Sequence, residues 1–263
     1  MYTDIFNGAK MKKLLASLST VLSLSAMPTN AEEFSVSTTI GFESSYVFRG
    51  VQFAETSFQP AINLSYGNFY ANAWLNLPIG DDDFVSTPGG EELDLVFGYS
   101  SALSEKTTFD VGVTYYTFPD LASGFFDTFS EDGDGLGANT VEVYGGLSYD
   151  TLLAPSLYVY HDFMFDTTTV EGGISHTVPL KKDWSIGLGG TLGYVFDDDA
   201  GGDYLYGAAT ADIAYAFSED NSISAGVRYG GSDIAGGSLI DDSIAGTTKS
   251  SGFWYGLSFS STF

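Results

Sequence analysis

Cysteine is absent from this 263-residue chain, and basic residues are few, with nine Lys and Arg against 34 Asp and Glu. The lack of cysteine excludes disulfides, thiolate metal sites and cysteine nucleophiles. Nine scattered basic side chains form no basic face, so no nucleic-acid partner is expected. No run of about 18 apolar residues follows residue 31, which excludes a membrane-spanning helix in that part of the chain.

Aromatic residues and glycine are abundant instead. The chain is 16% aromatic and 44% hydrophobic, contains 32 glycines, and has a mean hydropathy of +0.07. So many large apolar side chains exclude a disordered chain despite the formal charge of -25. Lys, Arg and Glu are scarce, whereas Gly, Tyr, Phe, Ser and Asp, which are poor helix formers, are heavily used. The composition therefore favours an all-β chain of one domain.

The N-terminal region has the features of a secretory signal peptide. Met11-Lys12-Lys13 forms a basic start, an apolar run covers 14–24, and small residues precede a cleavage point after Ala31. Residues 11–31 are therefore the predicted signal peptide, and residues 1–10 an extension upstream of the true start. An N-terminal membrane anchor is the alternative. Residues 32–263 form the exported domain.

Apolar and polar residues alternate with period 2 from Phe34 almost to the C terminus, which predicts strands of about ten residues. Such strands span a bilayer when tilted, and bacterial barrels use even strand numbers. The pattern predicts an antiparallel up-and-down transmembrane β-barrel with apolar side chains facing lipid and small polar ones facing a lumen. The twelve expected strands are 33–48, 58–66, 69–77, 91–102, 107–118, 139–149, 156–164, 169–180, 185–196, 204–217, 222–230 and 252–263.

The connections and the strand ends fit this barrel. Short turns alternate with mostly longer acidic loops, the asymmetry expected between the periplasmic and extracellular ends. Aromatic residues gather at strand ends on the lipid face, where rings sit well at headgroup level. The expected periplasmic belt is Phe34, Tyr66, Phe69, Phe109, Tyr149, Phe217 and Phe263, and the extracellular belt is Tyr46, Phe58, Phe196 and Tyr204.

Several segments resemble a known family. They are 45–52 (SYVFRGVQ), 59–61 (QPA), 67–74 (GNFYANAW), 92–95 (ELDL), 114–119 (TYYTFP) and 142–149 (EVYGGLSY). These segments are similar to the TorF-type porins, small Gram-negative outer-membrane β-barrel proteins. The resemblance covers about 40–150, and the long acidic loop 119–138 departs from it. It implies an outer-membrane pore and names no solute.

Ten ionisable residues are expected on the lumen face. They are Glu43, Arg49, Glu92, Asp94, Asp110, Glu142, Asp162, Glu171, Asp212 and Arg228. A narrow pore lined by eight acids attracts cations and repels anions, and the two arginines are expected to be held by these acids. A salt-bridged plug that closes the barrel is the alternative. Inward aromatic residues, among them Tyr70, Tyr144 and Tyr158, either stack ligands such as sugars or nucleosides or fill the lumen.

Calcium binding in a loop and a lipid-modifying activity are two further functions that the sequence could indicate. The acidic loop segment 131–135 resembles a calcium loop, but in that register position 12 is Val141, so the bidentate acid is missing. An outer-membrane lipid-modifying enzyme needs a catalytic histidine. The only two, His161 and His176, are expected on the lipid face, and neither lies beside a Gly-x-Ser-x-Gly elbow.

The sequence therefore favours a non-enzymatic outer-membrane pore for passive diffusion of small hydrophilic, cationic or neutral solutes, with no cofactor or metal. The alternative is a structural or adhesive barrel with a plugged lumen, whose extracellular loops bind ligands. The expected partners are outer-membrane lipid and lipopolysaccharide, small solutes, and the barrel assembly machinery, which reads the C-terminal strand ending at Phe263. The oligomeric state is left open.

Overall fold

The computed structural model describes residues 34–79, 91–119, 124–126, 128, 139–197, 202–234, 239–241 and 247–263. The expected upstream extension, signal peptide and calcium-like loop lie outside these residues, as do the acidic loop segments 81–83 and 198–199. Among the described residues, no helix is long and apolar enough to cross a membrane.

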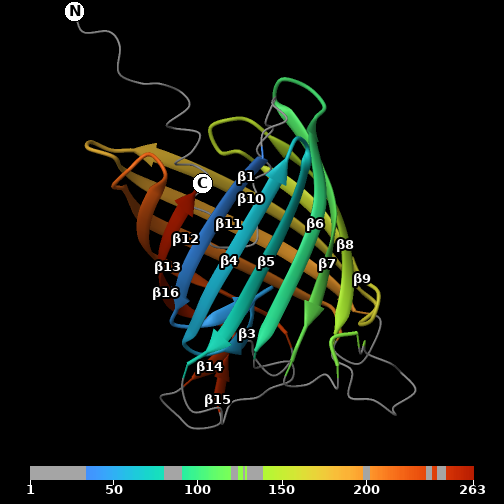
Figure 1. Ribbon diagram of the computed structural model, residues 1–263. Helices are drawn as coiled ribbons and strands as arrows, with labels where there is room; N and C mark the ends of the chain where they lie inside the picture. The colour runs from blue at the N-terminus through green and yellow to red at the C-terminus, as the bar shows by residue number, and fades with distance from the viewer. Residues whose placement is uncertain are drawn as a thin grey trace, which may run out of the picture.

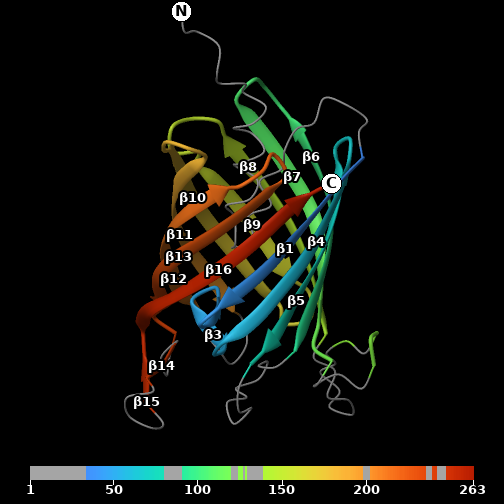
Figure 2. The same ribbon diagram turned by 60° about the vertical axis from the view of Figure 1, so that its left-hand side comes forward.

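The fold is a closed barrel of twelve antiparallel strands, which confirms the predicted architecture and strand number (Figure 1). Each strand pairs with its neighbours in chain order, and β1 also pairs with β16 to close the sheet, as their adjacent position in Figure 2 shows. The barrel strands are β1 (Phe34–Glu43), β4 (Ser57–Tyr66), β5 (Phe69–Pro78), β6 (Glu92–Ala102), β7 (Thr107–Thr117), β8 (Thr140–Tyr149), β9 (Ser156–Asp162), β10 (Thr167–Pro179), β11 (Trp184–Asp197), β12 (Tyr204–Ala216), β13 (Asn221–Ser232) and β16 (Ser251–Thr262).

The alternation in the sequence becomes two faces of the wall. In β16 the odd-numbered Phe253 and Tyr255 are 77% and 62% exposed on the outside, whereas Trp254 and Ser258 are each 9% exposed on the inside. Because successive side chains of a strand point to opposite faces, this inside-out pattern repeats around the barrel. An outer face of exposed apolar residues and an inner face of polar ones is the arrangement of a membrane barrel.

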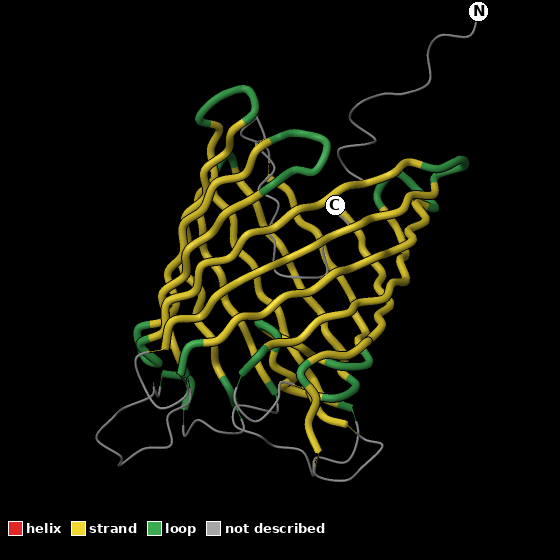
Figure 3. Tube along the Cα trace, turned by 180° about the vertical axis from the view of Figure 1, so that it is seen from behind, coloured by secondary structure: helices red, strands yellow, loops and turns green. Residues whose placement is uncertain are grey.

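The two rims of the barrel differ. Tight turns, such as 67–68, 103–106 and 180–183, join strands at one rim, where the C terminus also lies (Figure 3). We call this the turn rim and the opposite one the loop rim. The expected periplasmic belt lies at the turn rim, and its outermost members, Phe34 and Phe263, are 61% and 77% exposed.

The first strand is shorter than predicted. Pairing of β1 with β16 ends at Glu43, and the chain then forms a two-stranded hairpin of β2 (Tyr46–Phe48) and β3 (Val51–Ala54). Its two turn residues, Arg49 (φ 46°) and Gly50 (φ 76°), both have positive φ, as a type I′ turn requires. The prediction of one strand over 33–48 is therefore wrong for its last residues. A second small hairpin joins β14 (Leu239–Asp241) to β15 (Thr247–Lys249).

Two members of the expected extracellular belt are also misplaced. Tyr46 belongs to the hairpin and is only 7% exposed, because its ring packs against Trp74 inside the barrel. Tyr204 shares the inner face of β12 with the buried Tyr206, and their ring centroids are 6.3 Å apart. Neither tyrosine therefore faces lipid.

Candidate functional site

The hairpin at residues 46–54, called the luminal hairpin below, crosses the inside of the barrel. On one side its Tyr46 ring lies 5.3 Å from Trp74 of β5. At the tip, a Cβ atom on Gly50 would lie 2.6 Å from the Gly231 carbonyl oxygen of β13 and 2.6 Å from Tyr206 Cβ of β12. The hairpin thus reaches from one wall to the other and narrows the lumen near the loop rim.

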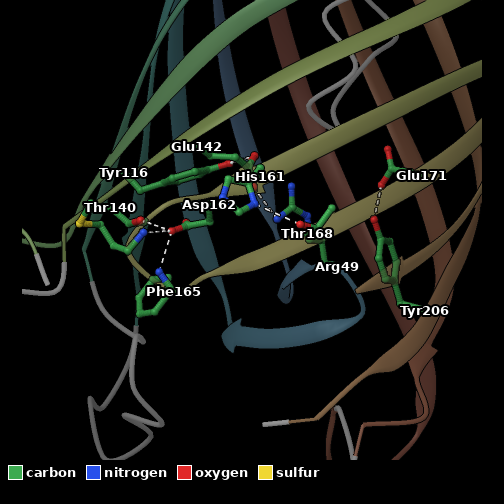
Figure 4. A network of polar contacts seen from close by, with 11 residues as sticks. Arg49, Tyr116, Thr140, Glu142, His161, Asp162, Phe165, Thr168, Glu171 and Tyr206 are labelled. Atoms are coloured by element: carbon green, nitrogen blue, oxygen red, sulfur yellow. Dashed lines mark hydrogen bonds and ion pairs between the residues drawn. The ribbon is translucent and has the colours of Figure 1, made fainter. Parts of the chain in front are cut away.

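Arg49 fixes the tip of the hairpin to the wall. Its Nη1 atom lies 2.7 Å from Glu142 Oε2 of β8, and the two side chains are only 12% and 2% exposed (Figure 4). The guanidinium carbon also lies 4.8 Å from the centre of the Tyr160 ring. A buried ion pair with ring stacking holds a planar guanidinium in one orientation.

Glu142 is bound from a second direction as well. The Tyr116 hydroxyl donates a hydrogen bond to Glu142 Oε1 at 3.0 Å, so both carboxylate oxygens have partners. Phe48 of the hairpin approaches the same Tyr116 ring, with centroids 6.1 Å apart. Arg49, Glu142 and Tyr116 therefore form one unit that holds the hairpin against β7 and β8.

The second arginine belongs to a separate ion cluster on the opposite wall. Arg228 of β13 contacts Glu43 of β1 at 3.2 Å and Asp212 of β12 at 3.0 Å, and its side chain is 4% exposed. Two glycines make room for this cluster. A Cβ atom would lie 1.9 Å from Asp212 Oδ1 at Gly226 and 2.1 Å from Glu43 Oε1 at Gly256.

Glu92 and Asp94 form a buried acid pair that makes no ion pair with a basic side chain of the described residues. They are 4% and 0% exposed and lie on the inner face of β6, two residues apart. Neither Asp94 oxygen accepts a hydrogen bond from a described N–H or hydroxyl group. The chain's two arginines are bound to other carboxylates, so neither of them neutralises this pair.

Asp162 and Glu171 are held by neutral groups. Asp162 accepts hydrogen bonds from the Thr140 hydroxyl and, at 2.9 Å each, from the backbone N–H groups of Met164 and Phe165. These bonds shape the β9–β10 turn, so Asp162 has a structural task that the alternation alone did not reveal. Glu171 Oε2 accepts a 2.6 Å hydrogen bond from the Tyr206 hydroxyl (Figure 4).

Asp110 is surrounded by tyrosines nearer the turn rim. Tyr70 and Tyr158 donate to its two oxygens at 2.7 and 3.1 Å, and the Tyr70 and Tyr144 hydroxyls lie 2.6 Å apart. Hydroxyl donors on both oxygens satisfy this buried carboxylate, which forms no ion pair with the described basic side chains.

Glycines directly across the sheet seat several of the luminal tyrosines. Cross-strand pairs join Tyr70 to Gly98, Tyr144 to Gly112, Tyr158 to Gly146 and Tyr206 to Gly193. In each pair a glycine Cβ atom would lie 2.2–2.4 Å from an atom of the tyrosine side chain. The rings therefore lie flat on the wall where the opposing strand has no side chain. This pairing was not foreseen from the sequence, although these aromatic and glycine residues alternate visibly within their strands.

The structure places all ten expected ionisable side chains inside the barrel. Eight are buried, and the other two, Arg49 and Glu171, are half-buried. Arg49 reaches the lumen from the turn of the hairpin. A first strand that continued through residue 48 would have placed it on the barrel wall. That solutes pass along these residues stays a prediction.

The two histidines lie apart, on the outer face. His161 contacts the Thr168 hydroxyl at 3.0 Å and the Phe163 ring, and His176 contacts the Leu152 carbonyl oxygen at 2.7 Å. Among the described residues no group of three or more His, Cys, Asp or Glu side chains is arranged to hold a metal ion. Within the described part of the chain, the lumen therefore holds the buried ion pairs and the hydrogen-bonded carboxylates.

A protein family covers most of the chain. The family Gcw_chp, described as a bacterial protein of unknown function, matches residues 27–195. The chain belongs to the Gcw_chp family. No curated protein sequence matches it. The narrower resemblance to TorF-type porins stays a prediction.

Solved structures with a similar fold include outer-membrane porins and channels. The KdgM porin has a TM-score of 0.52 and 12% identity, covering 87% of this chain and 99% of that chain. The NanC porin has a TM-score of 0.52 and 13% identity, covering 86% and 98%. The COG4313 outer membrane channel from Pseudomonas putida F1 has a TM-score of 0.54 and 11% identity, covering 92% and 100%. At these identities the likeness concerns the fold.

Proposed function

We propose that this Gcw_chp protein is an outer-membrane pore for passive diffusion of small hydrophilic solutes that are cationic or neutral. The observation that carries the proposal is the charge of the lumen. A closed barrel encloses eight carboxylates and two arginines, and each arginine is bound to a carboxylate. Such a lumen attracts cations, and its two arginines are not free to bind anions.

The luminal hairpin gives this pore a size limit. It crosses the barrel at the loop rim, and Arg49 and Glu142 lie at the constriction that it forms. A solute must therefore pass between the hairpin and the remaining wall. This geometry supports a narrow pore more than a wide, unselective one.

The charge distribution also separates this lumen from a path for acidic sugars. The KdgM porin has been solved in complex with oligogalacturonate, which is a polyanion. Here a polyanion would pass Glu171 and the Glu142 constriction with no unpaired arginine to compensate it. Although this barrel and the KdgM porin share a fold, we expect this barrel to prefer solutes whose charge differs from that of oligogalacturonate.

The outer surface supports an outer-membrane location. Its apolar residues face lipid, its rims would meet headgroups and lipopolysaccharide, and Phe263, 77% exposed, ends the strand that the barrel assembly machinery would read.

A plugged structural barrel is the second candidate. The specific observation in its favour is that eight of the ten luminal ionisable residues are buried and that the hairpin spans the lumen. In this case the barrel would be a rigid support for ligand-binding loops at the loop rim.

Swelling of liposomes that contain the refolded protein separates the two functions. Folding is checked first by the heat-modifiable mobility typical of membrane barrels. Matched solutes such as arabinose, lysine hydrochloride and sodium glutamate are then compared. The pore proposal expects fast entry of arabinose and lysine and slow entry of glutamate. No entry of any solute into liposomes holding folded protein would support the plugged barrel.

A further inference from the structure

Four luminal tyrosines form a continuous strip along one wall. Tyr158 and Tyr160 of β9 lie side by side with ring planes only 23° apart and centroids at 5.8 Å. Tyr144 of β8 contacts both, at 6.4 and 5.8 Å, and its hydroxyl meets that of Tyr70 at 2.6 Å. We call Tyr70, Tyr144, Tyr158 and Tyr160 the tyrosine strip. It runs from the hairpin tip, where Arg49 covers Tyr160, toward the turn rim.

The strip lines the lumen without filling it. Tyr70, Tyr144 and Tyr158 each lie on the glycine of the neighbouring strand, so their rings follow the wall and do not project across the barrel. Tyr144, Tyr158 and Tyr160 remain half-buried, and their exposed parts face the inside. The glycines opposite Tyr70, Tyr144 and Tyr158 thus favour rings that are open to stacking over rings that fill the lumen.

The hydroxyls of three strip tyrosines, Tyr70, Tyr144 and Tyr158, are already engaged, so the free surface of these rings is apolar. Tyr70 and Tyr158 donate to Asp110, and Tyr144 contacts Tyr70. The guanidinium of Arg49 lies on the Tyr160 ring, whereas the polar groups next to Tyr144 and Tyr158 lie beside their rings. Glu171, the cross-strand neighbour of Tyr158, is half-buried and carries a carboxylate within the same wall. Flat apolar surfaces next to hydrogen-bond acceptors fit a solute that has an apolar face and hydroxyl groups around its edge.

We propose that the tyrosine strip is a binding track for uncharged sugars. The C–H face of a pyranose ring lies on Tyr144 or Tyr158, and ring hydroxyls donate to Glu171. The neighbouring rings of Tyr144 and Tyr158, whose centroids are 6.4 Å apart, offer two adjacent positions for successive rings of an oligosaccharide. Acidic sugars are excluded by the carboxylates that flank the strip. This inference rests on the pore function proposed above and names its solute class.

Block of the ion current by maltotriose tests the proposal. In single-channel recordings of the refolded protein, maltotriose should interrupt the current reversibly, and trigalacturonic acid, a trisaccharide of similar size with three negative charges, should not. Tyr158→Leu removes a ring and should raise the half-blocking maltotriose concentration about tenfold. Tyr158→Phe keeps the ring and should change it less than threefold. Tyr255→Leu, on the outer face, should leave it unchanged.

The failure of this inference differs from failure of the pore function. A conducting channel that maltotriose does not block, or that trigalacturonic acid blocks equally, overturns the sugar track and leaves the pore intact. If the folded barrel does not conduct, calorimetric titration of the detergent-solubilised barrel with maltotriose decides the matter. Heat of binding that Tyr158→Leu and Tyr144→Leu abolish supports the track, and absence of heat in the wild-type barrel contradicts it.

Discussion

The ion pair between Arg49 and Glu142 should hold the luminal hairpin in place, and replacing Arg49 by methionine should release it. Methionine keeps much of the length and apolar stem and removes the charge. The variant leaves Glu142, 2% exposed, with only the Tyr116 hydroxyl from the unit described above. Breaking a buried ion pair by removing one partner typically costs about 3–5 kcal/mol.

That energy sets the expected size of the effect. At about 3 kcal/mol, the population of an unseated hairpin rises roughly 150-fold, since each 1.4 kcal/mol is a factor of about ten. Single-channel recordings should therefore show transitions to a larger conductance that are on the order of a hundred times more frequent in Arg49→Met than in wild type.

Two further variants isolate the cause. Arg228→Met removes the same charge from the lumen but touches Glu43 and Asp212 instead of the hairpin, so it should leave the large-conductance events rare. Glu142→Gln should also release the hairpin while lowering cation selectivity, whereas Arg49→Met raises it. Equal event frequencies in Arg49→Met and Arg228→Met would refute the reasoning.

Three other predictions follow from the same contacts. Gly98→Ala places a Cβ atom 2.2 Å from Tyr70 Cζ and should lower the free energy of unfolding in urea by about 1–3 kcal/mol. Combining it with Tyr70→Ala should recover part of that loss. If the effects of the two substitutions simply add, the contact between Gly98 and the Tyr70 ring does not limit stability. Asp94→Asn removes a buried carboxylate that neither arginine neutralises and should raise the unfolding free energy at neutral pH by about 1–3 kcal/mol, so a less stable variant would show that a cation or donor satisfies Asp94. Replacing both Arg49 and Arg228 by alanine should shift the reversal potential toward that of a purely cation-selective pore, and an unchanged potential would place the arginines outside the ion path.

The barrel could be predicted because its signal is local. Alternation places Phe253 and Tyr255 outside and Trp254 inside regardless of which strands become neighbours, so strand number and facing follow from the sequence. The alternation did not predict the luminal hairpin. Its residues alternate as β1 does, and only the turn at Arg49-Gly50, with positive φ at both residues, marks the reversal.

The interior contacts depend on register across distant strands. Arg49 and Glu142 are 93 residues apart in sequence, and no spacing rule brings them together. The tyrosine seats likewise require Tyr70 to stand opposite Gly98, which is decided by the pairing of β5 with β6. The face of the barrel wall that each side chain occupies could therefore be predicted from the sequence, whereas the residues that it contacts could not.

The reversal potential of single channels under a tenfold potassium chloride gradient tests the central claim most directly. The refolded barrel should conduct steadily, and its reversal potential should have the same sign as the potassium equilibrium potential. The reason is that both arginines are paired, so the carboxylates determine the electric field in the lumen. A chloride-selective potential, or silence from protein shown to be folded by its heat-modifiable mobility, would contradict the account.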